Sequence, residues 1–299
     1  MKTTIHKKDR HEEIMAYLIS APFLLIFFTF TVLPVVISIV LSFTNFNMLQ
    51  APTFIGAENY SRLFLHDSIF KKAVGNTLIL AVVTGPLSYL LSLFVAWFIN
   101  ELSPKMRALV TLIFYAPSIS GNVYLVWQML FSNDSYGYVN ATLYNLGIIT
   151  QPIMWLKDTR YLLTIICVVA LWTSLGTSFL TFISGFQGVD RGYYEAAAMD
   201  GVKNRWQELW FITLPLIKPQ MMFGAVMNIT ASFGIGAIVT NLAGFPTTDY
   251  AAHTILNHLE DYGTTRYELG YASAIATVLF LMMVGCNILI QRILSKVGK

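Results

Sequence analysis

The chain has 299 residues, of which 56% are hydrophobic and only 12% carry a charge. Soluble domains are about 45–50% apolar and about 25% charged, so this composition excludes a typical soluble domain and favours a protein embedded in a lipid bilayer. The formal net charge of +3 is small, and no nucleic-acid partner is expected.

Six long stretches of the chain contain no Asp, Glu, Lys or Arg. A charged side chain at the centre of a bilayer costs about 2.5–3.5 kcal/mol, and a helical span needs about 20 apolar residues. The expected fold class is therefore all-α, a polytopic membrane protein with six transmembrane helices. The predicted spans cover residues 16–43, 75–99, 108–131, 161–185, 216–240 and 271–291.

The distribution of basic residues predicts the orientation. Six spans place both termini on one side, and if that side is the cytoplasm, 13 Lys and Arg lie inside and 6 lie outside. Short cytoplasmic loops gather Lys and Arg, so both termini are predicted to be cytoplasmic. Residues 1–15 would then form a cytoplasmic segment and residues 16–299 the transmembrane domain. The apolar run after residue 15 is longer than that of a signal peptide, so we expect an uncleaved first span.

The segments between the spans are unequal in length. Three predicted outer segments, 44–74, 132–160 and 241–270, are each about 30 residues long and carry aromatic side chains, so they could cap a pathway or receive a partner. Cys167 and Cys286 fall within predicted spans, where we expect them to act as small core side chains rather than to form a disulfide.

The inner loop 186–215 carries two helix patterns. Asp190 is suited to cap a short helix that ends at Gly201, and a second helix through Trp206 should end or kink at Pro215. Tyr194, Ala197 and Ala198 are spaced to share one face of the first helix. Periodicity alone leaves open an amphipathic helix that merely anchors the loop at the membrane surface.

The order of short motifs in this loop resembles the EAA loop of binding-protein-dependent importer permeases, in particular the maltose-type carbohydrate branch. Gly270-Tyr-Ala-Ser-Ala274 is similar to a run common in sugar permeases. The loop departs from the usual pattern in an Asp where many relatives have Pro and in one extra residue, so no roles are transferred to Lys203, Asn204 or Arg205. The motifs that carry the resemblance are Glu195-Ala196-Ala197, Asp200-Gly201 and Ile212-Thr213-Leu214-Pro215.

The resemblance implies a permease subunit of the bacterial plasma membrane that imports a carbohydrate, with an oligosaccharide as the expected substrate. Its first loop helix would be a coupling helix that docks on a cytoplasmic ATPase dimer, with Glu195, Ala196, Ala197, Asp200 and Gly201 as the coupling residues. The other implied partners are a second homologous permease and an extracytoplasmic solute-binding protein. ATP and Mg would be used by the partner ATPase, and this chain would bind no cofactor.

Missing motifs limit the alternatives. The phosphate-binding pattern G-x-x-x-x-G-K-[ST] is absent, since the one Gly-Lys pair is Gly298-Lys299, so energy must come from another subunit or from an ion gradient. An ion-coupled secondary transporter of a small polar solute is the alternative, although the six long stretches that form the cores of the spans contain no Asp, Glu, Lys or Arg. Neither H-E-x-x-H nor G-x-S-x-G occurs, and His253 and His258 are interpreted as loop histidines. No enzyme activity, catalytic residue or metal site is predicted.

Uncharged polar residues interleaved with aromatic rings suit a sugar, which offers hydroxyl groups and ring faces. The resemblance places substrate contacts in the fifth span, where Asn228, Ser232 and Phe233 lie about one turn apart. Tyr124 and Trp127 in the third span and Trp172 in the fourth are further pathway candidates. Helix packing is the alternative role for each of these residues.

Overall fold

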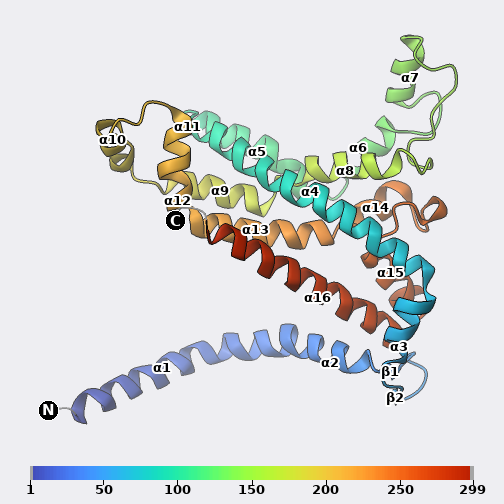
Figure 1. The fold of residues 1–299 in the computed structure, drawn as a ribbon, viewed down its shortest axis with the longest axis horizontal. Helices are drawn as coiled ribbons and strands as arrows, with labels where there is room; N and C mark the ends of the chain where they lie inside the picture. Colours follow the sequence, from blue (N-terminus) through green and yellow to red (C-terminus); the bar gives the residue numbers. More distant parts are fainter. Residues whose placement is uncertain (1–2, 297–299) are drawn as a thin grey trace. The chain divides into compact units, whose positions relative to one another are not determined.

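The computed structural model describes residues 3–296, with the side chains of residues 14–296 (Figure 1). Its regular secondary structure is helical apart from one pair of two-residue strands. The described residues divide into unit 1, residues 3–66 and 261–277, and unit 2, residues 67–260 and 278–296. The predicted N-terminal segment 1–15 is helical from Thr3, and its first two residues lie outside the described range.

Unit 1 contains the first candidate span and a short connection that follows it. The span covers Ile14–Leu41, close to the predicted 16–43, and none of its most apolar 18-residue window is buried. The elements of unit 1 are α1 (Thr3–Phe27), η1 (Phe28–Val32), α2 (Leu33–Leu41), β1 (Thr44–Asn45), β2 (Thr53–Phe54), α3 (Glu58–Ser61), η2 (Arg62–His66), η5 (Asp261–Thr265) and the first residues of α16 (Leu269–Leu294).

The start of α16 is fixed to the strand pair of unit 1. The strands are antiparallel, with Thr44 opposite Phe54, and the Gly270 N–H donates to the Phe46 carbonyl at 2.9 Å. A Cβ atom at Gly270 would lie only 2.0 Å from the Thr44 carbonyl oxygen. Glycine is therefore required here because the helix and the strand backbone approach so closely.

Unit 2 holds the remaining helices. They are α4 (Ser68–Asn100), α5 (Pro104–Ile119), α6 (Val123–Leu130), α7 (Tyr138–Asn145), α8 (Leu162–Thr173), α9 (Thr177–Gln187), α10 (Arg191–Met199), α11 (Arg205–Glu208), η3 (Leu209–Thr213), α12 (Leu214–Leu216), α13 (Lys218–Phe233), α14 (Gly236–Ala243), η4 (Thr248–Tyr250) and α15 (Ile255–Glu260), together with the C-terminal part of α16. Within unit 2, α10 and α11 lie at one end, and α7, α14 and α15 lie at the other (Figure 1).

The described residues contain four helices long and apolar enough to cross a membrane, and six if each of two bent pairs forms one span. The four are Ile14–Leu41, Ser68–Asn100, Leu162–Gln187 and Leu269–Leu294, and they match the first, second, fourth and sixth predicted spans. The bent pairs are Pro104–Ile119 with Val123–Leu130, and Arg205–Leu216 with Lys218–Phe233, each bent by 81°. The chain is thus the all-α polytopic membrane protein expected from its sequence.

Three predicted spans are interrupted where continuous helices were expected, and in one of them, 161–185, α8 and α9 are separated at residues 174–176. The span 108–131 breaks after Ile119, where Pro117 lacks an N–H donor and Gly121 weakens helix propagation. The span 216–240 begins after the bend at Ile217 and is interrupted again between Phe233 and Gly236. The loop helix, which was expected to end or kink at Pro215, continues to Leu216, and the chain then bends by 81° into α13.

Helix α4 packs along unit 2 and contributes to both of its core clusters. One cluster combines Leu93, Ala96 and Ile99 of α4 with side chains of α9 and the 209–221 region. The other combines Leu80 of α4 with side chains of α8 and α14. The helices α9 and α13 lie beside α4 and beside each other (Figure 1). Unit 2 is therefore assembled around α4.

The close approach at Gly270 predicts a stability effect. Gly270→Ala should lower the free energy of unfolding by about 1–3 kcal/mol, because the new methyl group overlaps the Thr44 carbonyl and forces the helix away from the strand. The matched control is Gly285→Ala on the same helix, where a Cβ atom has no neighbour within 4 Å. Thermal unfolding in detergent measures both, and equal melting temperatures would contradict the prediction.

Candidate functional site

Helix α10 begins and ends as its sequence predicts. The Asp190 carboxylate accepts a hydrogen bond from the Gly192 N–H at 2.9 Å, which caps the first turn. At the other end, the Val202 N–H donates to the Ala197 carbonyl at 3.0 Å and the Gly201 N–H donates to the Ala198 carbonyl at 3.3 Å. This is a Schellman ending with Gly201 at φ +92°, a conformation that favours glycine.

Most of α10 is exposed. Ala197 is buried, and the Tyr194 hydroxyl lies 2.9 Å from the Thr213 hydroxyl, so these two residues form the inward face. Ala198, which was expected to share that face, is exposed because it is one residue, about 100° of helix, beyond Ala197. Glu195 and Ala196 are also exposed. The exposed surface of the helix therefore combines the small Ala196 and Ala198 and the Glu195 carboxylate with the larger Tyr193 and Met199 side chains.

The loop behind α10 is joined to the end of α4. The Trp206 ring lies 5.1 Å from the Trp97 ring and 6.0 Å from the Phe94 ring. Aromatic pairs of this kind contribute about 0.5–1.5 kcal/mol beyond the area they bury. This contact lies in the part of the loop to which the family resemblance assigned no roles. No sequence pattern predicts that Trp206 contacts Trp97.

An exposed ion-pair network accompanies the aromatic joint. Arg205 pairs with Glu208 at 2.7 Å and with Glu101 at 3.0 Å. The hydrogen bond that Arg205 donates to Glu208, followed by the negative charge of Glu101, raises the pKa of Arg205. The Arg205 side chain is 62% exposed. Exposed pairs contribute about 0.2–1 kcal/mol, so the tryptophan contact is the stronger of the two attachments.

A cavity of about 450 Å³ lies between α4, α13 and the C-terminal part of α16. Asn228, Ser232 and Phe233, the predicted pathway residues of the fifth span, all line it. Its other lining residues are mostly apolar: Leu78, Ala81, Val82, Gly85, Pro86, Tyr89, Leu90, Ala225, Ile229, Cys286, Leu289, Ile290, Ile293 and Leu294.

The polar groups beside the cavity are hydrogen-bonded within the protein. The Ser88 hydroxyl donates to Asn228 Oδ1 at 2.9 Å, and Asn228 Nδ2 donates to the Gly224 carbonyl at 3.2 Å. The Ser232 hydroxyl donates to the Asn228 carbonyl at 2.7 Å. In this conformation Asn228 therefore links α13 to α4, and Ser232 bonds to the backbone of its own helix. Their contact with a substrate stays a prediction.

The remaining pathway candidates lie elsewhere. Trp127 packs edge to face on Trp172 at 5.3 Å, and it stacks on Phe131 at 5.8 Å. Tyr124 and Trp127 pack against the core cluster formed by α8 and α14. The structure thus brings the three candidates of the fifth span together and places the aromatic candidates of the third and fourth spans in a separate group.

The 132–160 segment forms a lobe that is organised by Asn140. This side chain is buried and donates to the carbonyls of Ser132, Asp134 and Ile153, while its oxygen accepts from the Trp155 indole at 2.8 Å. No sequence pattern predicted this role for Asn140.

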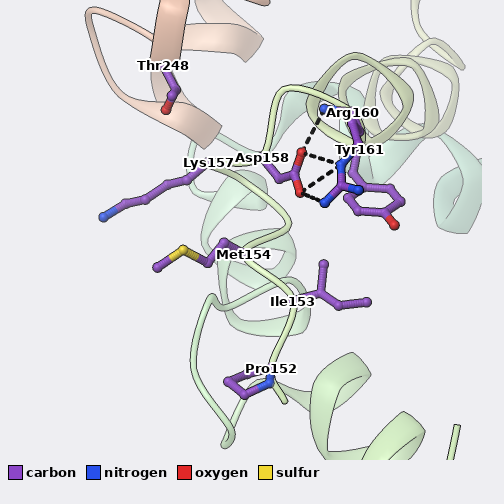
Figure 2. Close-up of a pocket in the computed structure, with 8 residues that line it drawn as sticks. All are labelled: Pro152, Ile153, Met154, Lys157, Asp158, Arg160, Tyr161 and Thr248. Atoms are coloured by element: carbon purple, nitrogen blue, oxygen red, sulfur yellow. Dashed lines mark hydrogen bonds and ion pairs between the residues drawn. The ribbon is translucent and has the colours of Figure 1, made fainter. Parts of the chain in front are cut away.

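An open pocket of about 540 Å³ lies on this lobe (Figure 2). Arg160 and Asp158 form an ion pair at 2.7 Å on its rim, and their hydrogen bond lowers the pKa of Asp158. Figure 2 shows Lys157 extending away from this pair. The lining residues are Pro152, Ile153, Met154, Lys157, Asp158, Arg160, Tyr161 and Thr248.

The two histidines that were interpreted as loop residues are buried in unit 2. His253 Nε2 lies 3.2 Å from His258 Nδ1, and His258 Nε2 lies 3.0 Å from Asp67 Oδ2. Asp67 also caps α4 by accepting from the Phe70 N–H. Among the residues whose side chains are described, no group of three or more His, Cys, Asp or Glu is arranged to hold a metal ion.

Several apolar helices, together with two bent helix pairs that could each form a further span, define a multi-pass membrane protein. The sequence model of the binding-protein-dependent transport system inner membrane component matches residues 88–298, and the chain belongs to this family. The resemblance seen in the loop motifs is thereby confirmed. The family is a membrane component of transport systems rather than an enzyme, and it places the chain in the inner membrane.

The chain is similar to named permeases over nearly all of its length. It is 32% identical to the probable ABC transporter permease protein YesP of Bacillus subtilis, over 94% of this chain and 90% of that protein. It is 31% identical to the lactose transport system permease protein LacF of Rhizobium radiobacter, over 92% of each. The arabinooligosaccharides transport system permease protein AraP of Halalkalibacterium halodurans is 26% identical over 91% of this chain and 85% of its own length.

The fold has also been seen before. A chain of a bacterial ABC transporter involved in the import of the acidic polysaccharide alginate superimposes with a TM-score of 0.74 over 98% of this chain and 99% of that chain. The sequence identity is 23%, so this likeness describes the fold alone.

The Ser88–Asn228 contact predicts a measurable interaction energy. A double-mutant cycle with Ser88→Ala and Asn228→Ala should give a coupling of about 0.6 kcal/mol, and at most about 1.7 kcal/mol, typical of hydrogen bonds between membrane helices. The control cycle pairs Ser88→Ala with Thr230→Ala, an exposed residue that bonds within its own helix, and its effects should add. Unfolding titrations in mixed micelles measure both cycles, and additive effects of Ser88→Ala and Asn228→Ala would contradict the contact.

Proposed function

We propose that this chain is the permease subunit of an ATP-binding-cassette importer that moves a carbohydrate across the plasma membrane. It would pair with a second homologous permease, bind a cytoplasmic ATPase dimer and receive its substrate from an extracytoplasmic solute-binding protein. Membership of a binding-protein-dependent family supports the solute-binding protein as a partner.

The geometry of α10 is the observation that carries the proposal. The helix is capped at both ends, stands at one end of unit 2 and exposes Glu195, Ala196 and Ala198 (Figure 1). Small side chains allow close approach to another protein, and a carboxylate can pair with a cation there. Asp200 and Gly201 would hold the chain reversal that keeps α10 in place.

Relatives support the substrate class. The names of LacF and AraP assign them to lactose and arabinooligosaccharide transport systems, and both match this chain over at least 85% of their length. The cavity lining has no ionisable group other than a tyrosine and a cysteine. An uncharged sugar agrees with such a lining. Asn228, Ser232 and Phe233 are the proposed contacts, and they would become available when α4 and α13 separate.

ATP and Mg would be used by the partner ATPase, since the chain has no phosphate-binding loop of its own. The excess of Lys and Arg on one side supports a cytoplasmic location for α10 and both termini. ATP binding would close the ATPases against α10 and open the pathway outward, and hydrolysis would return it inward.

The left-handed conformation of Gly201 supplies a test of ATPase docking. Gly201→Val should reduce co-purification of the ATPase about fivefold or more, because a β-branched residue at positive φ costs about 1–3 kcal/mol and distorts the end of α10. Gly201→Asn is the matched control, since Asn tolerates this conformation and should retain the ATPase. Absence of an ATPase from preparations of the unmodified chain would refute the importer proposal.

Uptake tests the substrate class. Deletion of the gene should abolish growth on at least one oligosaccharide while growth on free amino acids stays unchanged, because the permease would be the membrane path for that sugar. Re-expression of the chain should restore growth, and re-expression of Gly201→Val should restore it poorly. A deletion strain that grows normally on every oligosaccharide tested, but fails on another class of solute, would overturn the carbohydrate assignment.

A further inference from the structure

We infer that helix α4 transmits the movement of the coupling loop, residues 186–215, to the opposite end of unit 2, and that Trp97 is the residue that receives it. The inference rests on the proposed function, because it requires an ATPase that moves α10. It goes further by naming a positioning residue outside the loop and the segment that responds.

The first part of the case is the joint at the loop end of α4. Trp206, four residues beyond the α10 ending at Val202, packs on Trp97 and Phe94 of α4. Arg205 adds an ion pair with Glu101, directly after the last residue of α4. Tyr194 of α10 is held to Thr213 in the same loop, so α10 and this joint belong to one connected structure.

The second part is a set of buried hydrogen bonds at the far end of α4. Asn76 Nδ2 donates to the carbonyls of Tyr250 and His253, at 3.1 and 3.0 Å. The Ile255 N–H donates to the Thr77 hydroxyl at 2.9 Å. His258 adds its contact with Asp67, the capping residue of α4. These bonds join the 250–258 segment to α4.

The third part is the continuity of α4 between these two joints. It has 33 residues, which corresponds to about 50 Å at 1.5 Å per residue, and Pro86 does not interrupt it. The neighbouring helices are interrupted: α8 and α9 are separated at residues 174–176, and α13 begins at an 81° bend. Packed helices shift as units rather than deforming gradually, so a displacement at Trp97 should reach the 250–258 segment.

The experiment follows the far end of unit 2 in the assembled transporter. Thr248→Cys, an exposed position in a chain with Cys167→Ala and Cys286→Ala, is labelled with a maleimide in the presence and absence of ATP, Mg and vanadate. The labelling rate should differ between the two conditions. Trp97→Ala should reduce that difference about fivefold or more, while the ATPase still co-purifies, because Trp97 is not part of the exposed face of α10.

Four further variants make the result specific. Trp206→Ala should cause the same loss, and the double variant should lose no more, since both remove one contact. Trp97→Phe should restore most of the response. Leu91→Ala, an exposed apolar position on the same helix, is the matched control and should keep it.

Other outcomes contradict the inference in separate ways. An unchanged response in Trp97→Ala would exclude transmission through this joint, and loss of the ATPase from Trp97→Ala but not from Leu91→Ala would assign Trp97 to docking. An unmodified complex that contains the ATPase but shows no nucleotide-dependent labelling would refute the inference and leave the proposed function intact. Absence of the ATPase from the unmodified complex would refute the proposed function itself.

Discussion

The structure of unit 2 depends on the burial of one face of α4 along its whole length. Small and polar side chains such as Thr84, Ser88 and Ser92 are buried on that face together with Leu and Ala, which lets α9 and α13 pack closely against it. Lipid cannot satisfy exposed backbone groups, so irregular backbone at membrane depth has to be covered by protein. Helix α4 is unbroken and is in contact with α8, α9 and α13, each of which ends or bends within the apolar region. It therefore helps to cover the irregular backbone of these neighbours.

The division of chemistry along the chain fits a subunit that moves an uncharged solute with energy supplied from elsewhere. The cavity between α4, α13 and α16 has no Asp, Glu, Lys or Arg in its lining, whereas the ion pairs of Arg205 lie at the loop end of unit 2. The polar side chains beside this cavity bond within the protein, as the Ser88 hydroxyl does to Asn228. The energy for transport would then reach the spans through the movement of helices rather than through the movement of charges across them.

Features that depend on local sequence could be predicted, and those that depend on distant contacts could not. The caps of α10 at Asp190 and Gly201 follow from residue types within one turn, and the apolar spans follow from composition over about 20 residues. The break after Ile119 was missed because a proline within a membrane helix is compatible with either a kink or a break. The Trp97–Trp206 contact, the burial of His253 and the hub at Asn140 each join residues whose pairing leaves no periodic signal, so they required the structure.

The contacts at the far end of α4 also set an order of events during synthesis. Asn76 is separated by 177 residues from His253, whose carbonyl accepts its hydrogen bond. At about 5–20 residues per second, a ribosome needs roughly 9–35 s to supply that partner after Asn76 has been made. Throughout this interval the amide of Asn76 has to rely on other groups, at a cost if it faces lipid. A nascent chain that stops before residue 250 therefore lacks both of the carbonyl groups to which the Asn76 amide donates in the folded protein.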